Sequence, residues 1–150
     1  MVALEKNNML NDSIIVFSTD NGGAEAGFNN SNSASNWPLR GVKDTLWEGG
    51  VRGAAFVWSP RLRSRGRVSN QMMTIHDWLP TLYSAAGGQP GDLADMDGLD
   101  MWPALVNNKP SPRRVILHNI EERRHLGAVR VGNFKLVKGS AYVGDWDTWY

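Results

Sequence analysis

A short apolar segment with a polar ending constrains this chain most. Residues 13–19 (Ser-Ile-Ile-Val-Phe-Ser-Thr) are rich in β-branched side chains and apolar on both faces, which is typical of a strand buried in a parallel sheet. Residues 20–23 (Asp-Asn-Gly-Gly) follow at once and end the strand with turn-forming residues. The pattern predicts an α/β layer with polar side chains at the carboxyl end of a central strand.

Size and charge narrow the class of protein. The chain has 150 residues, of which 41% are hydrophobic and 21% charged, so it is long enough for one globular domain with a core. Its net charge of +1 gives no electrostatic case for a nucleic-acid partner or an anionic membrane. No apolar run is long enough to span a bilayer, and residues 1–8 do not resemble a signal peptide. These features predict a soluble or lumenal protein.

The α/β part continues through several further segments. Residues 1–10 predict the end of an amphipathic helix, and residues 54–58 predict a second strand. Residues 77–86 predict a helix with Asp77 as its N-cap and two glycines after its end. Residues 24–36, rich in Asn, Ser and Ala, predict a long loop.

The pattern changes to antiparallel pairing near the end of the chain. The predicted elements are a strand at 115–120 and a hairpin formed by 128–131 and 134–137 around a two-residue Gly-Asn turn. We therefore expect the α/β domain at 1–108 and the start of a small antiparallel subdomain at 109–150, after a proline-containing linker.

Asp20 and Asn21 are candidate metal ligands because ligands of open α/β sheets bind beyond the carboxyl ends of strands. A carboxylate beside an amide carbonyl offers hard oxygen donors that suit calcium or magnesium. The glycines that follow permit a sharp chain exit. The same four residues also make an ordinary turn, so residue types alone leave both interpretations open.

Residues 37–52 mix charged residues, tryptophans and glycines without a regular period, which suits a structured active-site loop. Lys43 within it is a candidate for holding an oxyanion as a point charge, and a surface lysine beside acidic neighbours is the alternative. Three further charged residues of this segment are predicted to form an ion-pair scaffold beneath the loop: Arg40, Glu48 and Arg52.

The remaining charged residues carry weaker signals. The three histidines form no closely spaced ligand pair, so zinc is unsupported. His118, inside an apolar strand, is either a core histidine or a residue that lines a pocket. The arginines at 61, 63, 65 and 67 predict a solvated loop, with anion binding as the alternative. The aspartates at 92, 95, 97 and 100 lack the spacing of a calcium loop and predict an acidic turn.

Three motifs resemble the sulfatase family in their order and spacing. They are residues 17–23 (Phe-Ser-Thr-Asp-Asn-Gly-Gly), 36–43 (Asn-Trp-Pro-Leu-Arg-Gly-Val-Lys) and 46–53 (Leu-Trp-Glu-Gly-Gly-Val-Arg-Gly). Four further segments are similar to the arylsulfatase B branch: 76–82, 97–100, 117–120 and 128–136. The resemblance covers nearly the whole chain.

This resemblance implies an alkaline-phosphatase-like α/β fold, a calcium ion, and hydrolysis of a sulfate ester by a formylglycine made from cysteine. Asp20 and Asn21 match the late pair of calcium ligands of the family. Lys43 matches the lysine that contacts the sulfate, and His118 is a candidate second substrate-binding residue. The substrate would be a sulfated small molecule or glycosaminoglycan sugar. The implied location is lysosomal or secreted, and only in such a location would the sequons at Asn11 and Asn29 matter as glycan acceptors.

The rest of the family's site is missing from this sequence. The chain has no cysteine, so it holds no Cys-x-Pro-x-Arg element, and it also lacks the early Asp-Asp metal pair. Calcium usually takes about six to eight oxygens, which two side chains cannot supply. We therefore expect the C-terminal part of an enzyme, inactive in isolation. A phosphoesterase of the same superfamily, a non-catalytic sulfatase-like binding protein and an unrelated partner-binding α/β domain remain alternatives.

Overall fold

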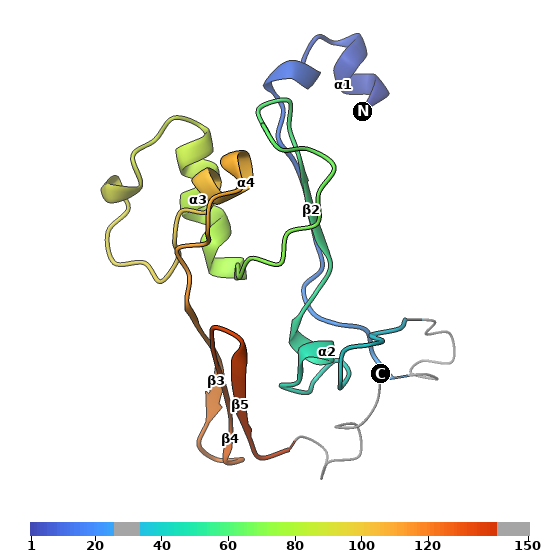
Figure 1. Cartoon of the computed structure of the whole chain (residues 1–150), viewed down its shortest axis with the longest axis vertical. Coiled ribbons are helices and arrows are strands. Elements are labelled where there is room, and N and C mark those ends of the chain that lie inside the picture. The colour runs from blue at the N-terminus through green and yellow to red at the C-terminus, as the bar shows by residue number, and fades with distance from the viewer. Residues whose placement is uncertain (26–33, 141–150) are drawn as a thin grey trace. The chain divides into compact units, whose positions relative to one another are not determined.

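The computed structural model describes residues 1–25 and 34–140 (Figure 1). The sequon at Asn29 and most of the loop predicted at 24–36 lie outside the described residues. The chain divides into two compact units. The first unit comprises Met1–Ile15 and Trp58–Arg114, and the second comprises Val16–Val57 and Val115–Tyr150. The predicted domain boundary after residue 108 stays a prediction.

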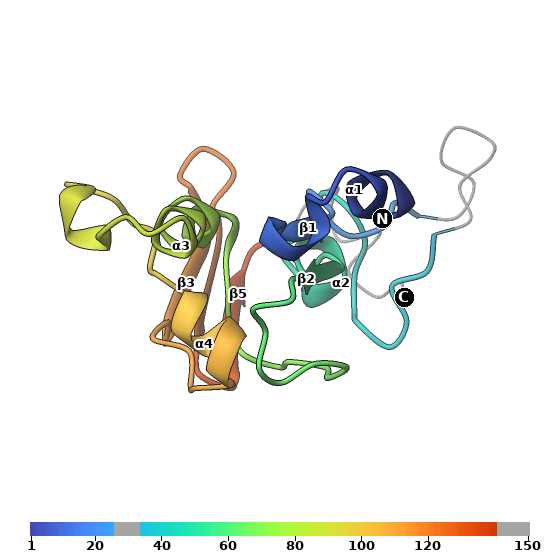
Figure 2. The same cartoon turned by 90° about the horizontal axis from the view of Figure 1, so that it is seen from above.

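Helices form the first unit. They are α1 (Val2–Lys6), η1 (Leu10–Asp12), η3 (Ile75–Asp77), α3 (Trp78–Ala85), η4 (Pro90–Asp92) and α4 (Trp102–Asn107), where η marks a 3-10 helix. The helices predicted at 1–10 and 77–86 are confirmed, although α1 already ends at Lys6. α4 was not predicted. It contacts α3 (Figure 1 and Figure 2), and Ala85, Met101 and Ala104 are buried in this unit.

Asp77 connects three segments of the first unit. It stands at the predicted N-cap position of α3, but its side chain makes no cap hydrogen bond to that helix. Its carboxylate instead accepts hydrogen bonds from the backbone N–H of Thr74 at 2.7 Å, from that of Leu99 at 2.8 Å and from Arg113 Nε at 2.8 Å. The predicted helix start is therefore right, while the role of the side chain is different.

Arg61 and Arg67 anchor their loop within the first unit by donating hydrogen bonds to backbone carbonyls. Arg61 donates to the carbonyl oxygen of Ala85 at 2.6 Å, and Arg67 donates to that of Leu105 at 2.6 Å. Arg61 remains exposed, but its guanidinium also lies 5.7 Å from the ring centroid of Trp102. The prediction of a merely solvated loop was therefore incomplete, because these side chains organise the loop against α3 and α4.

Two paired strands, β1 (Ile15–Ser18) and β2 (Ala55–Trp58), form as predicted, and all but one residue of each belongs to the second unit (Figure 1). Thr19 N donates to Ala54 O at 2.9 Å, and the rings of Phe17 and Phe56 stack at 5.5 Å. Residue numbers increase from Phe17 of β1 to Thr19 just after it, while those of their partners decrease from Phe56 of β2 to Ala54 just before it. The two strands are therefore antiparallel. The expected parallel pairing is wrong for the described residues, which also do not include the neighbouring strands and covering helices that a strand apolar on both faces requires. β2 is the only described neighbour of β1, and Phe17 is 50% exposed.

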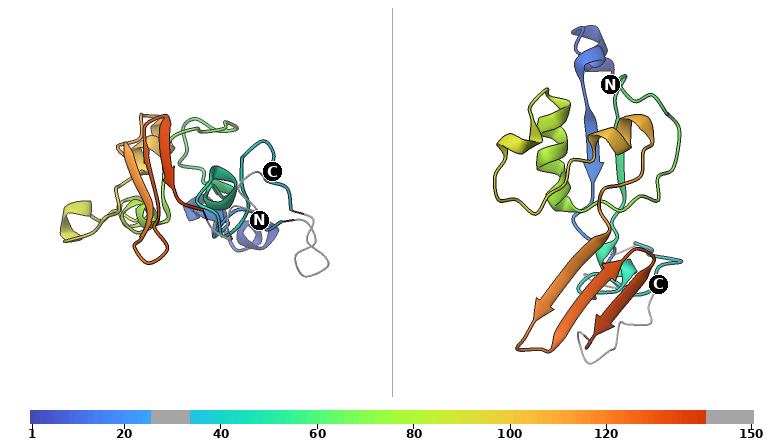
Figure 3. Two further views of the ribbon diagram at one scale, coloured as in Figure 1. Left: turned by 90° about the horizontal axis from the view of Figure 1, so that it is seen from below. Right: turned by 60° about the vertical axis from the view of Figure 1, so that its left-hand side comes forward.

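The second unit ends in an antiparallel three-stranded sheet of β3 (Val115–Glu121), β4 (Leu126–Val131) and β5 (Phe134–Lys138) (Figure 3). The predicted strand and hairpin are confirmed, and Val131 pairs with Phe134 across the turn. The register of β3 against β4 shifts between Leu117 and Asn119. His118 is therefore the extra residue of a β-bulge, a feature that redirects side chains.

Candidate active site

Asp20 and Asn21 lie directly beyond the end of β1, as predicted. Asp20 Oδ1 accepts a hydrogen bond from the backbone N–H of Asn21 at 2.9 Å. Asn21 Nδ2 donates to the carbonyl oxygen of Gly22 at 2.7 Å. Because the amide nitrogen is engaged with the backbone, the side-chain oxygen of Asn21 is the atom that can bind a metal. The pair offers one carboxylate and one amide oxygen, which is the donor chemistry of calcium.

The donor set fits calcium in kind but is too small. Among residues 1–25 and 34–140, no group of three or more His, Asp or Glu side chains is placed to hold a metal ion. Calcium usually takes about six to eight oxygens. Asp20 and Asn21 can therefore supply part of a calcium site, and the remaining ligands must come from elsewhere.

Asn36 joins the second motif to the turn that follows β1. Its Oδ1 accepts the N–H of Gly23 at 2.8 Å, and its Nδ2 donates to the carbonyl oxygens of Gly23 at 2.9 Å and Gly41 at 3.2 Å. Lys43 N also donates to the carbonyl oxygen of Gly23 at 2.8 Å. The structure thus places the backbone of Lys43 beside the turn of Asp20 and Asn21. Asn36 opens the second motif, but its residue type alone does not predict these contacts.

The third motif forms α2 (Glu48–Val51) and packs against the other two through glycine backbones. Gly22 N donates to the carbonyl oxygen of Gly50 at 2.9 Å, and Gly49 N donates to that of Arg40 at 2.7 Å. A β-carbon on Gly22 would overlap the carbonyl oxygen of Gly49, and one on Gly49 would overlap that of Gly41. Only glycine permits this close approach. Through these backbone contacts the three motifs meet at one place.

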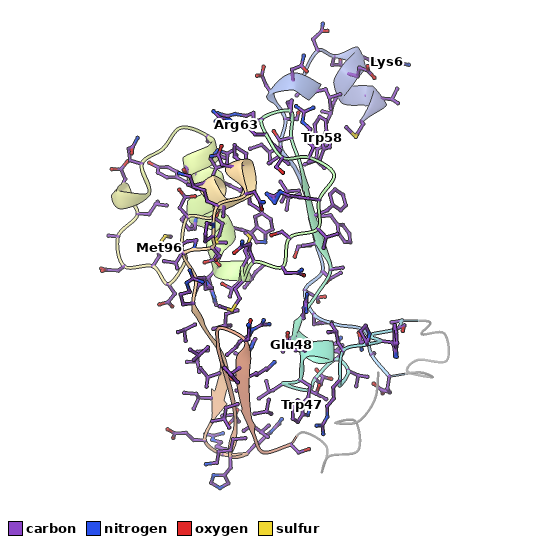
Figure 4. All side chains as sticks on the ribbon, in the orientation of Figure 1. Lys6, Trp47, Glu48, Trp58, Arg63 and Met96 are labelled. Atoms are coloured by element: carbon purple, nitrogen blue, oxygen red, sulfur yellow. The ribbon has the colours of Figure 1, made fainter. Side chains whose placement is uncertain are left out.

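Glu48 at the start of α2 forms ion pairs with the antiparallel sheet. Its Oε2 lies 2.9 Å from Arg130 Nη1 on β4, and its Oε1 lies 2.9 Å from Lys135 Nζ on β5. Figure 4 labels Glu48 and the preceding Trp47, over whose ring the Arg40 guanidinium lies at 3.9 Å. The predicted scaffold residue Glu48 is therefore paired, but with cations more than eighty positions away in the chain.

Burial and charge act against each other at Glu48. Burial by itself raises the pKa of the Glu48 carboxyl, but the hydrogen bond from Lys135 and the charges of Lys135 and Arg130 outweigh it, so the pKa is lowered. For Lys135 burial is the larger effect and lowers the pKa of the ammonium, opposed by the bond to Glu48. The carboxylate is therefore held in its charged form between two cations.

His118 lies near this cluster, and the charges of Lys135, Glu48 and Arg130 all act on its side chain. Burial lowers the pKa of His118, and the charge of Lys135 lowers it further while that of Glu48 opposes the change. Within the described part of the chain, His118 Nε2 and Trp47 Nε1 are buried without a hydrogen-bond partner. A contact of His118 with substrate stays a prediction.

A pocket of ≈ 480 Å³ opens in the second unit. Its lining begins at Asp44, the residue after Lys43, and includes Asn119 and Glu121 of β3 and Arg124 of the following turn. Carboxylate, amide and guanidinium groups here face one space, which suits a ligand with several hydroxyl groups.

Comparison with known proteins connects these motifs to a family. The sulfatase family profile matches residues 1–88. Mouse arylsulfatase J is 38% identical over 97% of this chain and 26% of its own length. Canine N-acetylgalactosamine-6-sulfatase is 34% identical over 83% of this chain and 23% of its own length. Human arylsulfatase A is 32% identical over 95% of this chain and 28% of its own length. The chain spans about a quarter of the length of these relatives.

Solved structures show the same relationship in three dimensions. The structure of Ps i-CgsB in complex with k-i-k-neocarrahexaose matches with a TM-score of 0.74 at 28% identity, over 91% of this chain and 30% of the other. PsFucS1 sulfatase from Pseudoalteromonas sp. matches with a TM-score of 0.74 at 29% identity, over 91% of this chain and 27% of the other. Among the described residues, no helix combines the length and apolar character needed to cross a bilayer. The expected alkaline-phosphatase-like fold is confirmed, and the chain belongs to the sulfatase family.

Proposed function

We propose that this chain is the C-terminal part of a calcium-dependent sulfatase and that the complete protein hydrolyses sulfate esters. One observation carries the proposal. The three motifs that resemble sulfatases meet through backbone contacts, with Asp20 and Asn21 on one of them and Lys43 on another. Membership of the sulfatase family supports the reaction type.

Each candidate residue has a defined role in this proposal. The carboxylate of Asp20 and the amide oxygen of Asn21 hold part of the calcium shell. The bound calcium would draw negative charge from the oxygens of the sulfate group. The ammonium group of Lys43 neutralises a sulfate oxygen as charge builds in the transition state. The formylglycine nucleophile and the other calcium ligands are supplied by an N-terminal part of the enzyme.

The substrate we propose is a sulfated sugar, as in the arylsulfatase B branch. N-acetylgalactosamine-6-sulfatase is named for a sulfated sugar, and Ps i-CgsB was solved with a neocarrahexaose. The pocket lined by Asp44, the residue that follows Lys43 in the sequence, has side chains that suit saccharide hydroxyls. His118 would line the substrate region. A lysosomal or secreted location, with a glycan at Asn11, goes with this proposal.

The test uses the full-length protein that carries this chain. The purified protein should hydrolyse 4-nitrophenyl sulfate much faster than 4-nitrophenyl phosphate, and should release sulfate from a sulfated N-acetylgalactosamine disaccharide. Faster phosphate release would favour a phosphoesterase. Saccharide binding without turnover, together with loss of the Cys-x-Pro-x-Arg element from the preceding sequence, would favour a non-catalytic binding protein.

A further inference from the structure

We propose that Glu48 is a positioning residue for the metal site, because it anchors α2 to the antiparallel sheet and thereby holds the turn of Asp20 and Asn21. The calcium part of this inference rests on the proposed function. The anchoring itself rests only on contacts within the second unit.

The sheet presents two cations that require an anion between them. Arg130 and Lys135 are register partners on the neighbouring strands β4 and β5, and like charges placed opposite each other destabilise a sheet. Glu48 gives one carboxylate oxygen to each cation at 2.9 Å. The Lys135 side chain is only 12% exposed and that of Glu48 25%, so solvent screens this cluster less than a surface pair. The sheet therefore holds the start of α2 in place.

Backbone contacts connect the start of α2 to the candidate metal ligands within a few residues. Gly49 and Gly50 follow Glu48 directly in α2, and Gly50 accepts the hydrogen bond of Gly22 N at 2.9 Å. Gly22 follows Asn21. Because the contact of Gly22 with Gly49 leaves no room for a β-carbon, a shift of α2 must move the turn as well.

A carboxylate at this position does more than stabilise the fold. Residues that orient metal ligands without touching the metal typically matter about 10- to 100-fold in metal affinity or activity. Glu48 has this relation to Asn21, through Gly50 and Gly22. It also makes the site depend on Arg130 of β4 and Lys135 of β5, which follow Glu48 by more than eighty residues in the chain.

The experiment replaces the charge and keeps the shape. In the full-length protein, Glu48→Gln should raise the calcium dissociation constant about 10- to 100-fold. Excess calcium should restore most of the turnover of 4-nitrophenyl sulfate. Hydrogen exchange of a peptide that covers residues 18–24 should become faster. Lys135→Met removes the ion pair of Glu48 with Lys135 from the side of the sheet. The double variant should bind calcium no more weakly than Glu48→Gln alone.

Asp77→Asn is the matched control, because it removes the carboxylate of a buried ion pair in the first unit. It should lower stability and leave the calcium dissociation constant unchanged. If Glu48→Gln keeps the calcium affinity and the hydrogen exchange of the wild type, in a protein that hydrolyses sulfate, the positioning role of Glu48 is overturned. A wild-type protein that neither binds calcium nor hydrolyses sulfate would refute the proposed function instead, and the exchange of residues 18–24 would still decide whether Glu48 anchors the turn.

Discussion

Gly22 lies so close to Gly49 that a β-carbon on Gly22 would overlap the carbonyl oxygen of Gly49. Gly22→Ala should therefore lower the free energy of unfolding by at least about 2 kcal/mol, because the backbone must move to relieve the overlap. Gly91→Ala is the control, since nothing lies within 4 Å of its β-carbon position. It should change stability by less than about 1 kcal/mol. Urea unfolding of both variants checks this, and equal midpoints would show that the motifs do not meet as described.

Breaking the ion pair of Asp77 with Arg113 should cost more than a surface ion pair would. The Asp77 side chain is 0% exposed and that of Arg113 is 12% exposed. Asp77→Asn should lower the free energy of unfolding by about 3 kcal/mol at neutral pH, because a guanidinium loses its buried partner. A loss below about 1 kcal/mol, the value of an exposed pair, would contradict this.

The same carboxylate should make stability depend on acid. Burial raises the pKa of Asp77, but the bonds from Arg113, Leu99 and Thr74 outweigh it and hold the pKa below its ordinary value of 3.8. The folded state then binds the proton more weakly than the unfolded state. This stabilisation is present above pH 3.8 and is lost as the pH falls through the folded pKa. The difference between wild type and Asp77→Asn should shrink on acidification, as thermal melts in that range would show.

Local sequence patterns predicted most elements of the fold. The strands at β1 and β2, the helix α3 and the hairpin of β4 and β5 follow from side-chain period and turn residues, which are local properties. The helix α4 was missed because its six residues include a proline and no clear period. The exposure of Phe17 reflects the lack of further neighbours of β1 among the described residues, because apolar composition signals a preference for burial and not the presence of neighbours.

The candidate site divides in the same way. Asp20, Asn21 and Lys43 stand in recognisable motifs, so their type and order identified them. The cationic partners of Glu48 could not be identified in this way, because an ion pair across more than eighty positions leaves no periodic signal. Asn36 shows an intermediate case. It belongs to a recognised motif, but its contacts with Gly23 and Gly41 follow only from the folded loop.

His118 should make stability depend on pH in a range closer to neutrality than that of Asp77. Burial and the charge of Lys135 hold the pKa of His118 below its ordinary value of 6.5. Stability from the neutral side chain is therefore present above that pH and is lost as the pH falls towards the folded pKa. His118→Asn should have a shallower pH dependence between about pH 7 and 5, by at most about 1.4 kcal/mol per pH unit. Identical slopes for variant and wild type would exclude a depressed pKa.

Lys43 should affect turnover far more than folding. In the full-length enzyme, Lys43→Ala should lower kcat/KM for a sulfate ester about 100-fold or more, because a cation that stabilises transition-state charge is lost. The melting temperature should change little. Lys109→Ala, at an exposed position of the first unit, is the control and should keep full activity. Unchanged turnover in Lys43→Ala would refute the sulfate contact.

The central claim is that this chain supplies part of a calcium site to a sulfatase. The most direct measurement is the calcium content of the full-length protein and of its Asp20→Ala variant by elemental analysis, with turnover of 4-nitrophenyl sulfate measured on the same samples. We expect stoichiometric calcium and sulfate hydrolysis in the wild type, and loss of both in Asp20→Ala, since a carboxylate ligand is removed. An Asp20→Ala protein that retains its calcium and its turnover would contradict the account.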